Sequence, residues 1–485
     1  MFQKATLLTV LIGTVSAAST ILEVNSKVIN INGTKAKIIS ITGSDGTWGY
    51  YAKSGQNFDV IVKNNLAEST VLHWHGLELP NDQDGTELTQ RVIPAHAEYH
   101  YNFKLKNTGT YWLHSHYDLQ EAHLAAAPLI IEAPEDAKLQ QVVIMFQDFT
   151  FNPTEVWTKL NAATPGATMH HAMNMPGMKM NSSTAGMPGM DMSEMKMDSS
   201  SAIRGNQALA IPHMKMDLND VAYNAFLTNF HTPEQAEIKY LKPGKVKLRF
   251  INAAFSSNFW INLGKLHGIA VAVDGRPIKA FHDSNYQLSE GQRLDIIVEI
   301  PKLGGTFPII AQVEGLKNQT GLILSTDSNL TQASIPKLAH TAAPALDNSE
   351  ELKINSSLPW VNKPVNQVLR YTLTGNMSPY VWKINDEVWP NITPAMIKQG
   401  DRVELDFVNN SSMSHPLHLH GYGFKVVAVN GKKIDGAIRD TVLVLPQQTV
   451  KVQFDATTTG RWFLHCHIGW HMGAGMMTYV EVMPL

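Results

Sequence analysis

One arrangement of residues occurs three times along the chain: a hydrophobic residue, a glycine turn, and an alternating apolar stretch that ends in asparagine. The copies are YYAKSGQNFDVIVKNNL, KYLKPGKVKLRFINAA and AMIKQGDRVELDFVNNS, which start near residues 50, 240 and 396. Alternation of apolar and polar residues is typical of a strand with one buried face. Each copy is therefore predicted to be a strand that enters a β-sandwich after a turn at Gly55, Gly244 or Gly400.

Short apolar alternations broken by Gly, Pro and Asn fill most of the remaining sequence, for example Lys27 to Ile41 and Phe58 to Lys63. Few helical patterns lie between them, which favours antiparallel β-sandwiches. The 485 residues are too many for one ordinary domain and suit three domains of roughly 100–200 residues. We therefore predict an all-β protein of three sandwich domains, at residues 19–135, 136–340 and 341–485.

Residues 1–18 are predicted to be a signal peptide. Lys4 supplies a positive charge, Ala5 to Val15 is apolar, and Val15-Ser16-Ala17 is a small-residue cleavage site. The apolar run is short for a membrane span, so no stable membrane insertion is expected. A buried first strand or an uncleaved anchor is the alternative. Because no twin arginine precedes the apolar run, we expect general (Sec-type) secretion, into the periplasm or the medium.

The single cysteine, Cys466, is the next constraint. One cysteine cannot form an internal disulfide, and a free thiol in an exported protein is reactive. Binding to a metal ion would protect it. The formal net charge of -3 gives no basic surface that would favour nucleic acid as a partner.

Four short strings contain ten of the chain's twenty histidines. They are His73-Trp74-His75-Gly76, His114-Ser115-His116, His415-Pro416-Leu417-His418-Leu419-His420-Gly421, and His465-Cys466-His467-Ile468-Gly469-Trp470-His471 with Met476 five residues further on. On a strand, residues i and i+2 point to the same face, so each His-x-His pair presents two imidazoles to one location. The cysteine of the last string points the opposite way. One strand can therefore contribute ligands to two metal sites.

The residues on the cysteine side form the ligand set of a blue-copper electron-transfer centre: a thiolate, two imidazoles and a thioether. Cys466, His471 and Met476 come from one loop, and His415 supplies the second imidazole. Zinc could bind the same atoms, but soft sulfur ligands favour copper. The other eight histidines are too many for one ion and suit three coppers with open positions for O2. A single His-x-His pair would more often be structural, whereas four strings together indicate a metal centre.

In this order, the four strings resemble the copper-binding motifs of the multicopper oxidases, which include laccases, ascorbate oxidase and bacterial copper-resistance oxidases. HWHGLELPNDQDG and NTGTYWLHSH extend the resemblance, which covers essentially the whole chain after the signal peptide. It implies three cupredoxin-like Greek-key β-sandwich domains and four copper ions. The implied ligands are, for type 1 copper, His415, Cys466, His471 and axial Met476; for type 2 copper, His73 and His418; and for the type 3 pair, His75, His114, His116, His420, His465 and His467.

The same resemblance implies how the enzyme works. Electrons from a reducing substrate enter singly at the type 1 copper and pass through Cys466 to His465 and His467, and O2 is reduced to water between the first and third domains. Asp84 occupies the position of the family's proton-relay carboxylate, although an aspartate there is also an ordinary turn residue. Many bacterial members carry a second acid directly after the last histidine ligand, where this chain has Met472.

A methionine-rich insertion, at about residues 161–216, is predicted in the second domain. Thioethers are soft ligands that prefer Cu(I), so a flexible methionine tract can collect copper, although the segment could also be a tolerated loop. Met413, close to His415 in sequence, could extend this path or could simply pack. The candidate Cu(I)-recruiting residues are Met169, His170, His171, Met173, Met175, Met178, Met180, Met187, Met190, Met192, Met195, Met197 and Met413.

This tract makes the chain resemble the bacterial copper-resistance oxidases, which implies oxidation of Cu(I) to Cu(II) in copper tolerance. Two features depart from that pattern. The twin-arginine signal is absent, and Ser411 and Gly473 stand where the efflux oxidases have Cu(I)-binding carboxylates. The alternatives are a laccase-like oxidase of small phenols and aromatic amines, and a non-catalytic copper-binding protein. A monomer is assumed.

Overall fold

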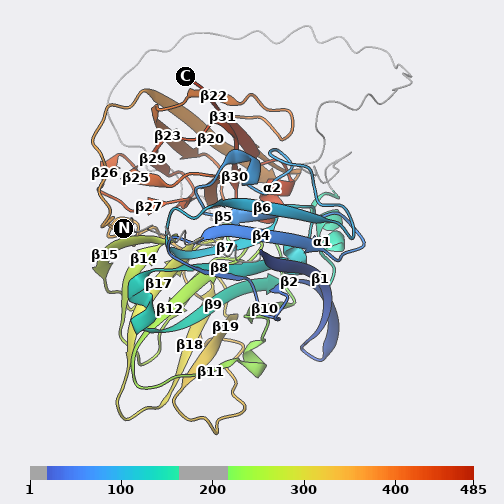
Figure 1. Ribbon diagram of the computed structural model, residues 1–485, viewed down its shortest axis with the longest axis vertical. Coiled ribbons are helices and arrows are strands. Elements are labelled where there is room, and N and C mark those ends of the chain that lie inside the picture. The colour runs from blue at the N-terminus through green and yellow to red at the C-terminus, as the bar shows by residue number, and fades with distance from the viewer. Residues whose placement is uncertain (1–18, 163–216) are drawn as a thin grey trace, which may run out of the picture.

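The computed structural model describes residues 19–162 and 217–485, and their strands form six β-sheets. The sheets pair into three sandwiches, each formed by strands from one part of the chain (Figure 1). The all-β class predicted from the sequence is confirmed. The helices in the described residues are short: α1 (Pro153–Leu160), α2 (Gly469–Gly473) and the 3-10 turns Asn81–Gln83, Glu121–His123, Pro134–Lys138 and Pro233–Gln235.

The first sandwich pairs sheet β2-β1-β4-β6 with sheet β3-β8-β7-β5. Its strands are β1 (Thr20–Ile31), β2 (Thr34–Gly43), β3 (Tyr50–Lys53), β4 (Asn57–Asn64), β5 (Leu72–His75), β6 (Glu98–Lys104), β7 (Gly109–Ser115) and β8 (Ala126–Glu132). The second sandwich pairs β10-β9-β12-β17-β14-β15 with β11-β19-β18-β13-β16. Its strands are β9 (Gln140–Phe149), β10 (Ala225–Thr228), β11 (Ile238–Tyr240), β12 (Gly244–Asn252), β13 (Phe259–Asn262), β14 (Gly268–Val273), β15 (Arg276–Phe281), β16 (Asn285–Leu288), β17 (Arg293–Ile300), β18 (Thr306–Val313) and β19 (Gln319–Ser325).

The third sandwich pairs β21-β20-β23-β29-β25-β26, with β27 beside β25, and β22-β31-β30-β24-β28. Its strands are β20 (Gln367–Met377), β21 (Tyr380–Ile384), β22 (Ala395–Lys398), β23 (Arg402–Asn409), β24 (His415–Leu419), β25 (Phe424–Val429), β26 (Lys432–Lys433), β27 (Ile438–Arg439), β28 (Thr441–Val444), β29 (Thr449–Asp455), β30 (Gly460–Cys466) and β31 (Met477–Met483).

The threefold sequence repeat corresponds to strands β4, β12 and β23. Each runs parallel to one neighbour (β1, β9 or β20) and antiparallel to the other (β6, β17 or β29). The predicted antiparallel sandwiches therefore also contain parallel strand pairs, because the chain crosses to the opposite sheet before each repeat strand and that strand returns in a parallel direction. The predicted turn glycines Gly55, Gly244 and Gly400 have φ of 81°, 121° and 91°, a region that favours glycine.

The stretch from Lys27 to Ile41, read as one alternation, is a hairpin of β1 and β2. Ile31 pairs with Thr34, which leaves a two-residue turn of Asn32 and Gly33 with φ of 52° and 84°. Asn-Gly is the preferred pair for such a turn because both residues tolerate positive φ. The Asn32-Gly33 pair therefore ends the first strand and starts the second, although the alternation of apolar residues continues on both sides of it.

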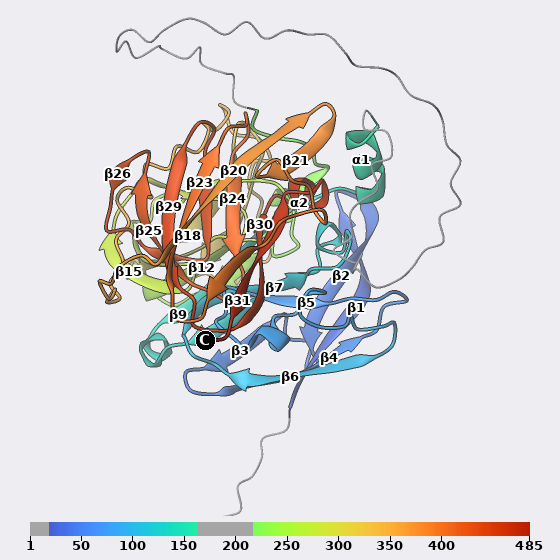
Figure 2. The same cartoon turned by 90° about the horizontal axis from the view of Figure 1, so that it is seen from above.

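One hydrophobic core runs through the first and third sandwiches, whereas the second has a core of its own. Leu113 and Trp74 belong to the same buried cluster as Leu419, Trp462 and other residues of the third sandwich. Both views show β30 beside β5 and β7 (Figures 1 and 2). This shared core fixes the positions of β5, β7, β24 and β30 relative to one another. These four strands carry the histidine strings.

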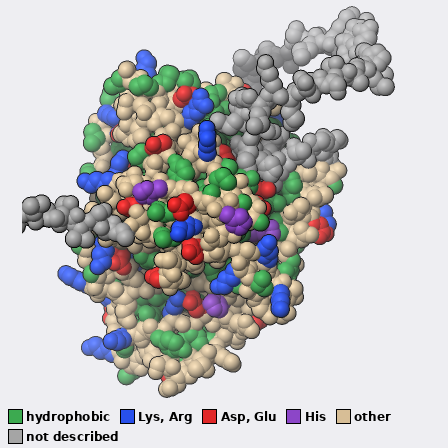
Figure 3. Space-filling model, turned by 45° about the vertical axis from the view of Figure 1, so that its right-hand side comes forward, with side chains coloured by type: hydrophobic (Ala, Val, Ile, Leu, Met, Phe, Trp, Pro, Cys, Tyr) green, Lys and Arg blue, Asp and Glu red, His purple; other side chains and the backbone are tan. Residues whose placement is uncertain are grey.

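The surface shown in Figure 3 carries basic and acidic side chains interspersed, without a broad field of one sign. Among the described residues, no helix combines the length and apolar character needed to span a bilayer.

Candidate metal centre

The four histidine strings lie on two pairs of antiparallel strands. In the first sandwich His73 on β5 stands opposite His114 on β7, and in the third His418 on β24 stands opposite His465 on β30. All ten histidines are buried. The structure therefore brings together residues that are up to about four hundred positions apart in the sequence.

Eight of these histidines form a cluster between the first and third sandwiches. Their nitrogens approach closely: Nε2 of His73 lies 3.4 Å from Nε2 of His418, and Nε2 of His420 lies 3.0 Å from Nε2 of His465. His116 groups with His420 and His465, with one nitrogen of each residue within 4.8 Å of the others. The remaining members are His75, His114 and His467, which pack against one another with ring centroids 5.0–5.8 Å apart.

Backbone carbonyls fix the outer nitrogen of three of these imidazoles. Nδ1 of His73 donates to the carbonyl of Asp84 (2.9 Å), Nδ1 of His418 to that of Asp440 (2.8 Å), and Nδ1 of His465 to that of Cys466 (2.9 Å). A proton fixed on Nδ1 leaves the lone pair on Nε2, which faces the cluster.

Buried carboxylates bind the outer nitrogens of three further histidines in the cluster. Oδ2 of Asp84 lies 2.9 Å from Nδ1 of His420, and Oε2 of Glu121 lies 3.1 Å from Nδ1 of His114. His75 is reversed, because its Nε2 donates to Oδ1 of Asp440 at 3.0 Å and its Nδ1 is left free. Asp440 and Glu121 had no sequence signal as site residues. Both side chains are buried beside the cluster, which only the structure shows.

The cluster has the chemistry that metal ions require. Nδ1 of His75, Nε2 of His114 and both nitrogens of His116 and His467 are buried without a hydrogen-bond partner among the described residues. Burial lowers the pKa of His75, His116 and His467 well below the ordinary histidine value, so these rings are neutral and carry free lone pairs. Unpaired buried nitrogens are costly, and copper binding removes that cost. The residues therefore fit a copper cluster.

A second, smaller site lies on the other face of β30. The Cys466 sulfur is 3.6 Å from Nδ1 of His415 and 3.7 Å from Nδ1 of His471, and those two nitrogens are 3.2 Å apart. The Met476 carbonyl accepts from the Cys466 N–H, and the Met476 side chain is fully buried in the same core. Burial raises the pKa of the Cys466 thiol, so a bound cation is needed to stabilise its thiolate.

Strand β30 connects the two sites. His465 reaches the cluster while the adjacent Cys466 reaches the smaller site, as alternation along a strand requires. His467, on the other side of the cysteine, also lies in the cluster, with its ring centroid 5.6 Å from that of His465. The two sites are thus one residue apart along the backbone.

The outer nitrogens of the smaller site lie beside polar groups of two different kinds. Nε2 of His415 lies 2.7 Å from the Ser411 hydroxyl. Nε2 of His471 lies 2.9 Å from Oδ2 of Asp220, which also accepts from the Tyr380 hydroxyl at 2.9 Å. Asp220 was missed by the sequence analysis, because neither motif nor spacing links it to His471. The sequence predicted no carboxylate at this position, whereas the structure has Asp220 there.

The remaining candidates are placed as follows. Asp84 is buried at the edge of the cluster, and burial raises the pKa of its carboxyl well above the usual range. Met472 packs near Trp389 and Phe463. Met413 is 3% exposed and packs in the core that contains Cys466. The signal peptide at 1–18 and the candidate recruiting residues between 169 and 197 lie outside the described residues.

Three models of the multicopper oxidase family match residues 23–136, 140–330 and 362–485. Multicopper oxidase MmcO of Mycobacterium tuberculosis is 30% identical, covering 89% of this chain and 80% of that protein. Copper resistance protein A of Escherichia coli is 25% identical, covering 95% and 92%. The laccase of Botrytis aclada has the same fold, with a TM-score of 0.72 at 20% identity over 96% of this chain and 89% of that one.

The three β-sandwiches, the eight-histidine cluster and the smaller site with Cys466 identify this protein as a copper-dependent oxidoreductase that uses O2. The chain belongs to the multicopper oxidases. Its three sandwiches are cupredoxin-like, and its cofactors are copper ions of types 1, 2 and 3, as the sequence predicted.

Proposed function

We propose that this multicopper oxidase oxidises Cu(I) to Cu(II) in copper tolerance and uses the electrons to reduce O2. Four Cu(I) ions, one O2 and four protons would give four Cu(II) ions and two water molecules. The observation that carries the proposal is the buried Asp220 carboxylate against the outer nitrogen of His471, 2.9 Å away. Names of relatives that include a copper resistance protein support the same assignment.

The proposed ligands follow the geometry of the two sites. The smaller site would bind type 1 copper and the cluster would bind the other three ions. These ions would supply one-electron uptake and four-electron reduction of O2. We assign them as follows: type 1, His415, Cys466, His471 and axial Met476; type 2, His73 and His418; type 3 pair, His75, His114, His116, His420, His465 and His467.

Asp220 gives the electron-uptake side a preference for cations. Its side chain is 1% exposed, and its Oδ1 has no hydrogen-bond partner among the described residues. A buried carboxylate oxygen without a donor is costly unless a cation approaches it. A Cu(I) ion bound there would lie next to His471, at the type 1 site. The methionine-rich segment that precedes residue 217 supports Cu(I) by its ligand chemistry alone.

Asp84 is the proposed proton relay. One oxygen lies 2.9 Å from Nδ1 of His420 and the other 3.5 Å from Nδ1 of His73, so the carboxyl touches two ligands of the cluster. Burial raises the pKa of its carboxyl, which favours the protonated form that a proton donor to oxygen reduction needs.

Export to the periplasm or the medium through the predicted signal peptide remains a proposal that follows from residues 1–18. We likewise propose a monomer whose partners are O2 and its small reducing substrate.

A laccase-like oxidase of phenols and aromatic amines is the second candidate. The same copper set can accept electrons from a phenol, and the fold is shared with a laccase. A carboxylate beside His471 can also accept a hydrogen bond from a phenol hydroxyl. The substrates must therefore be compared directly.

The deciding experiment measures O2 consumption by the copper-loaded protein with Cu(I) and with 2,6-dimethoxyphenol, with and without added Cu(II). Rapid Cu(I) turnover, with phenol oxidation only after Cu(II) is added, supports the copper-tolerance enzyme. Vigorous phenol oxidation without extra copper favours the laccase. No O2 uptake despite full copper content would favour a copper-binding protein.

A matched variant lacks residues 169–197. Its Cu(I) oxidation should fall while phenol oxidation is kept. Equal loss of both would mean that the segment has a structural role and no part in recruitment.

A further inference from the structure

Asp440 contacts two histidines that belong to different proposed copper sites. It follows β27 in the third sandwich and is 2% exposed. Its carbonyl accepts from Nδ1 of His418, and its Oδ1 accepts from Nε2 of His75. One residue thus fixes the tautomer and the ring orientation of a type 2 and a type 3 ligand.

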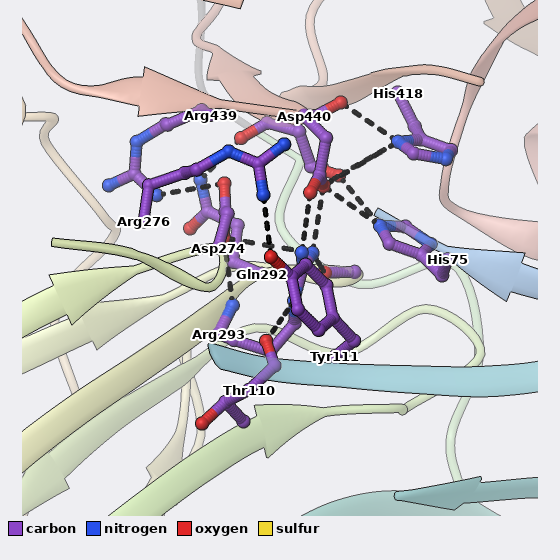
Figure 4. Close-up of polar contacts among 12 residues, drawn as sticks. His75, Thr110, Tyr111, Asp274, Arg276, Gln292, Arg293, His418, Arg439 and Asp440 are labelled. Carbon is purple, nitrogen blue, oxygen red and sulfur yellow. Dashed lines mark hydrogen bonds and ion pairs between the residues drawn. The ribbon is translucent and has the colours of Figure 1, made fainter. Parts of the chain in front are cut away.

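Arg293, at the start of β17 in the second sandwich, binds the Asp440 carboxylate with both ends of its guanidinium. Nη1 lies 2.7 Å from Oδ1, and Nη2 lies 2.5 Å from Oδ2 (Figure 4). Nη1 also donates to the Gly291 carbonyl at 2.7 Å, and Nε donates to the Thr110 carbonyl at 3.3 Å. These bonds leave the guanidinium, which is fully buried, a single orientation.

The chain leaves room for this pair beside the histidines. A Cβ at Gly76, directly after His75, would lie 2.4 Å from Nη2 of Arg293 and 2.5 Å from Oδ2 of Asp440. A Cβ at Gly291 would lie 2.9 Å from the His467 ring. Two glycines therefore allow the second sandwich to approach the cluster closely, although none of the eight clustered histidines lies in that sandwich.

A buried ion pair is weak evidence for a role in stability, because desolvation offsets much of the attraction. Here the pair has a second feature. The oxygen that Nη1 binds is the same Oδ1 that accepts from His75, so any rotation of the carboxylate would break both contacts. Gln292 adds a bond from its Nε2 to the Thr441 carbonyl at 3.1 Å, next to Asp440.

We propose that Arg293 is a positioning residue of the oxygen-reducing site, which orients Asp440 so that His75 and His418 keep their metal-binding nitrogens turned inward. The second sandwich, which contributes no histidine to the cluster, thereby sets the geometry of the type 2 and type 3 positions. The inference rests on the proposed assignment of His75 and His418 as copper ligands.

The test compares Arg293→Lys and Asp440→Asn with the wild-type holoenzyme. Lysine keeps the charge but cannot bind both oxygens. We expect type 2 copper affinity, measured by chelator competition, to fall about 10–100-fold, with a changed type 2 EPR spectrum. The blue absorption of type 1 copper should stay unchanged in both variants.

The matched control is Arg249→Lys. Arg249 is also fully buried in the second sandwich and bonds across to Thr110 (2.8 Å) and Asp136 (2.7 Å), but it does not bind Asp440. Its variant should keep the wild-type type 2 spectrum and affinity. Equal loss in this control would overturn the inference, since it would reflect loosened packing between sandwiches.

Two further results separate failure of the Arg293 role from failure of the ligand assignment. If Arg293→Lys does not accumulate, Asp440→Asn alone tests the same contact, and an unchanged type 2 spectrum and affinity in that variant overturns the proposal. If the wild-type protein binds four coppers without a type 2 signal, the ligand assignment itself fails, which is a separate outcome from failure of the Arg293 role.

Discussion

The two candidate copper sites differ in what surrounds them. The eight-histidine cluster lies between two sandwiches, and its outer nitrogens contact the carboxylates or carbonyls of Asp84, Glu121 and Asp440. The smaller site lies within the third sandwich, but its outer contact at His471 is Asp220, from a different part of the chain. Six of the eight clustered histidines have an orienting partner, whereas the smaller site has one acid, at His471, and one hydroxyl, at His415.

This difference matches two chemical tasks. Oxygen reduction needs several metal ions at fixed positions and a supply of protons, so rigid orientation is useful there. Electron uptake needs a donor to come close to one ligand, so a polar group on the outer side of His471 is useful. Variants that change one site therefore test whether the other site responds.

Cys466→Ser should have the largest effect, because it removes the residue that both sites share through β30. Serine lacks the soft thiolate, so blue absorption and O2 consumption should be abolished with Cu(I) and with phenols alike. The type 2 EPR signal should persist, since the eight histidines are unchanged. O2 consumption by this variant with any substrate would show that electrons do not pass through Cys466.

Asp84→Asn should slow O2 reduction by about 10²-fold, as loss of a proton donor commonly does. Asparagine can still accept from His420 but cannot deliver a proton. Stopped-flow absorbance should show type 1 copper reduced as fast as in the wild type and reoxidised slowly. Unchanged turnover would exclude the relay, and loss of type 1 reduction would contradict the independence of the two sites.

The sequence predicted the parts of these sites that are local and periodic. His73 and His75, or His465 and His467, share a face because they are two residues apart on a strand, and Cys466 opposes them for the same reason. Asp84 follows its histidines within one motif. The three sandwiches followed from a repeat whose strand and turn chemistry are also local.

The groups that orient the ligands were beyond prediction, since their contacts depend on how sandwiches pack. Asp440 meets His75 across 365 positions, and Arg293 meets Asp440 across 147. Asp220 reaches His471 across 251 positions. A lone acid or arginine has no spacing that marks its partner, so only the fold reveals it. The parallel strand pairs were missed for a similar reason, because alternation does not encode strand direction.

Asp220→Asn should affect only the electron-uptake side, and less strongly. Loss of the charge should lower kcat/KM for Cu(I) about tenfold, equivalent to ~1.4 kcal/mol, with a smaller effect on phenol oxidation. Asp217→Asn is the matched control, because it removes an exposed acid three residues away. A larger loss with phenol than with Cu(I) would favour the laccase function, and equal losses in both aspartate variants would remove Asp220 from the uptake site.

Met413→Leu should have the smallest effect. The Met413 side chain is 3% exposed in the core around Cys466, and its carbonyl accepts from Asn409 and Ser411 through bonds that leucine would keep. A volume-conserving change in a packed core costs less than about 1.5 kcal/mol. Cu(I) oxidation should therefore stay within about twofold of the wild-type rate. A loss near tenfold with an unchanged type 1 spectrum would instead mean that the thioether carries Cu(I) toward His415, and that uptake extends beyond the Asp220 side.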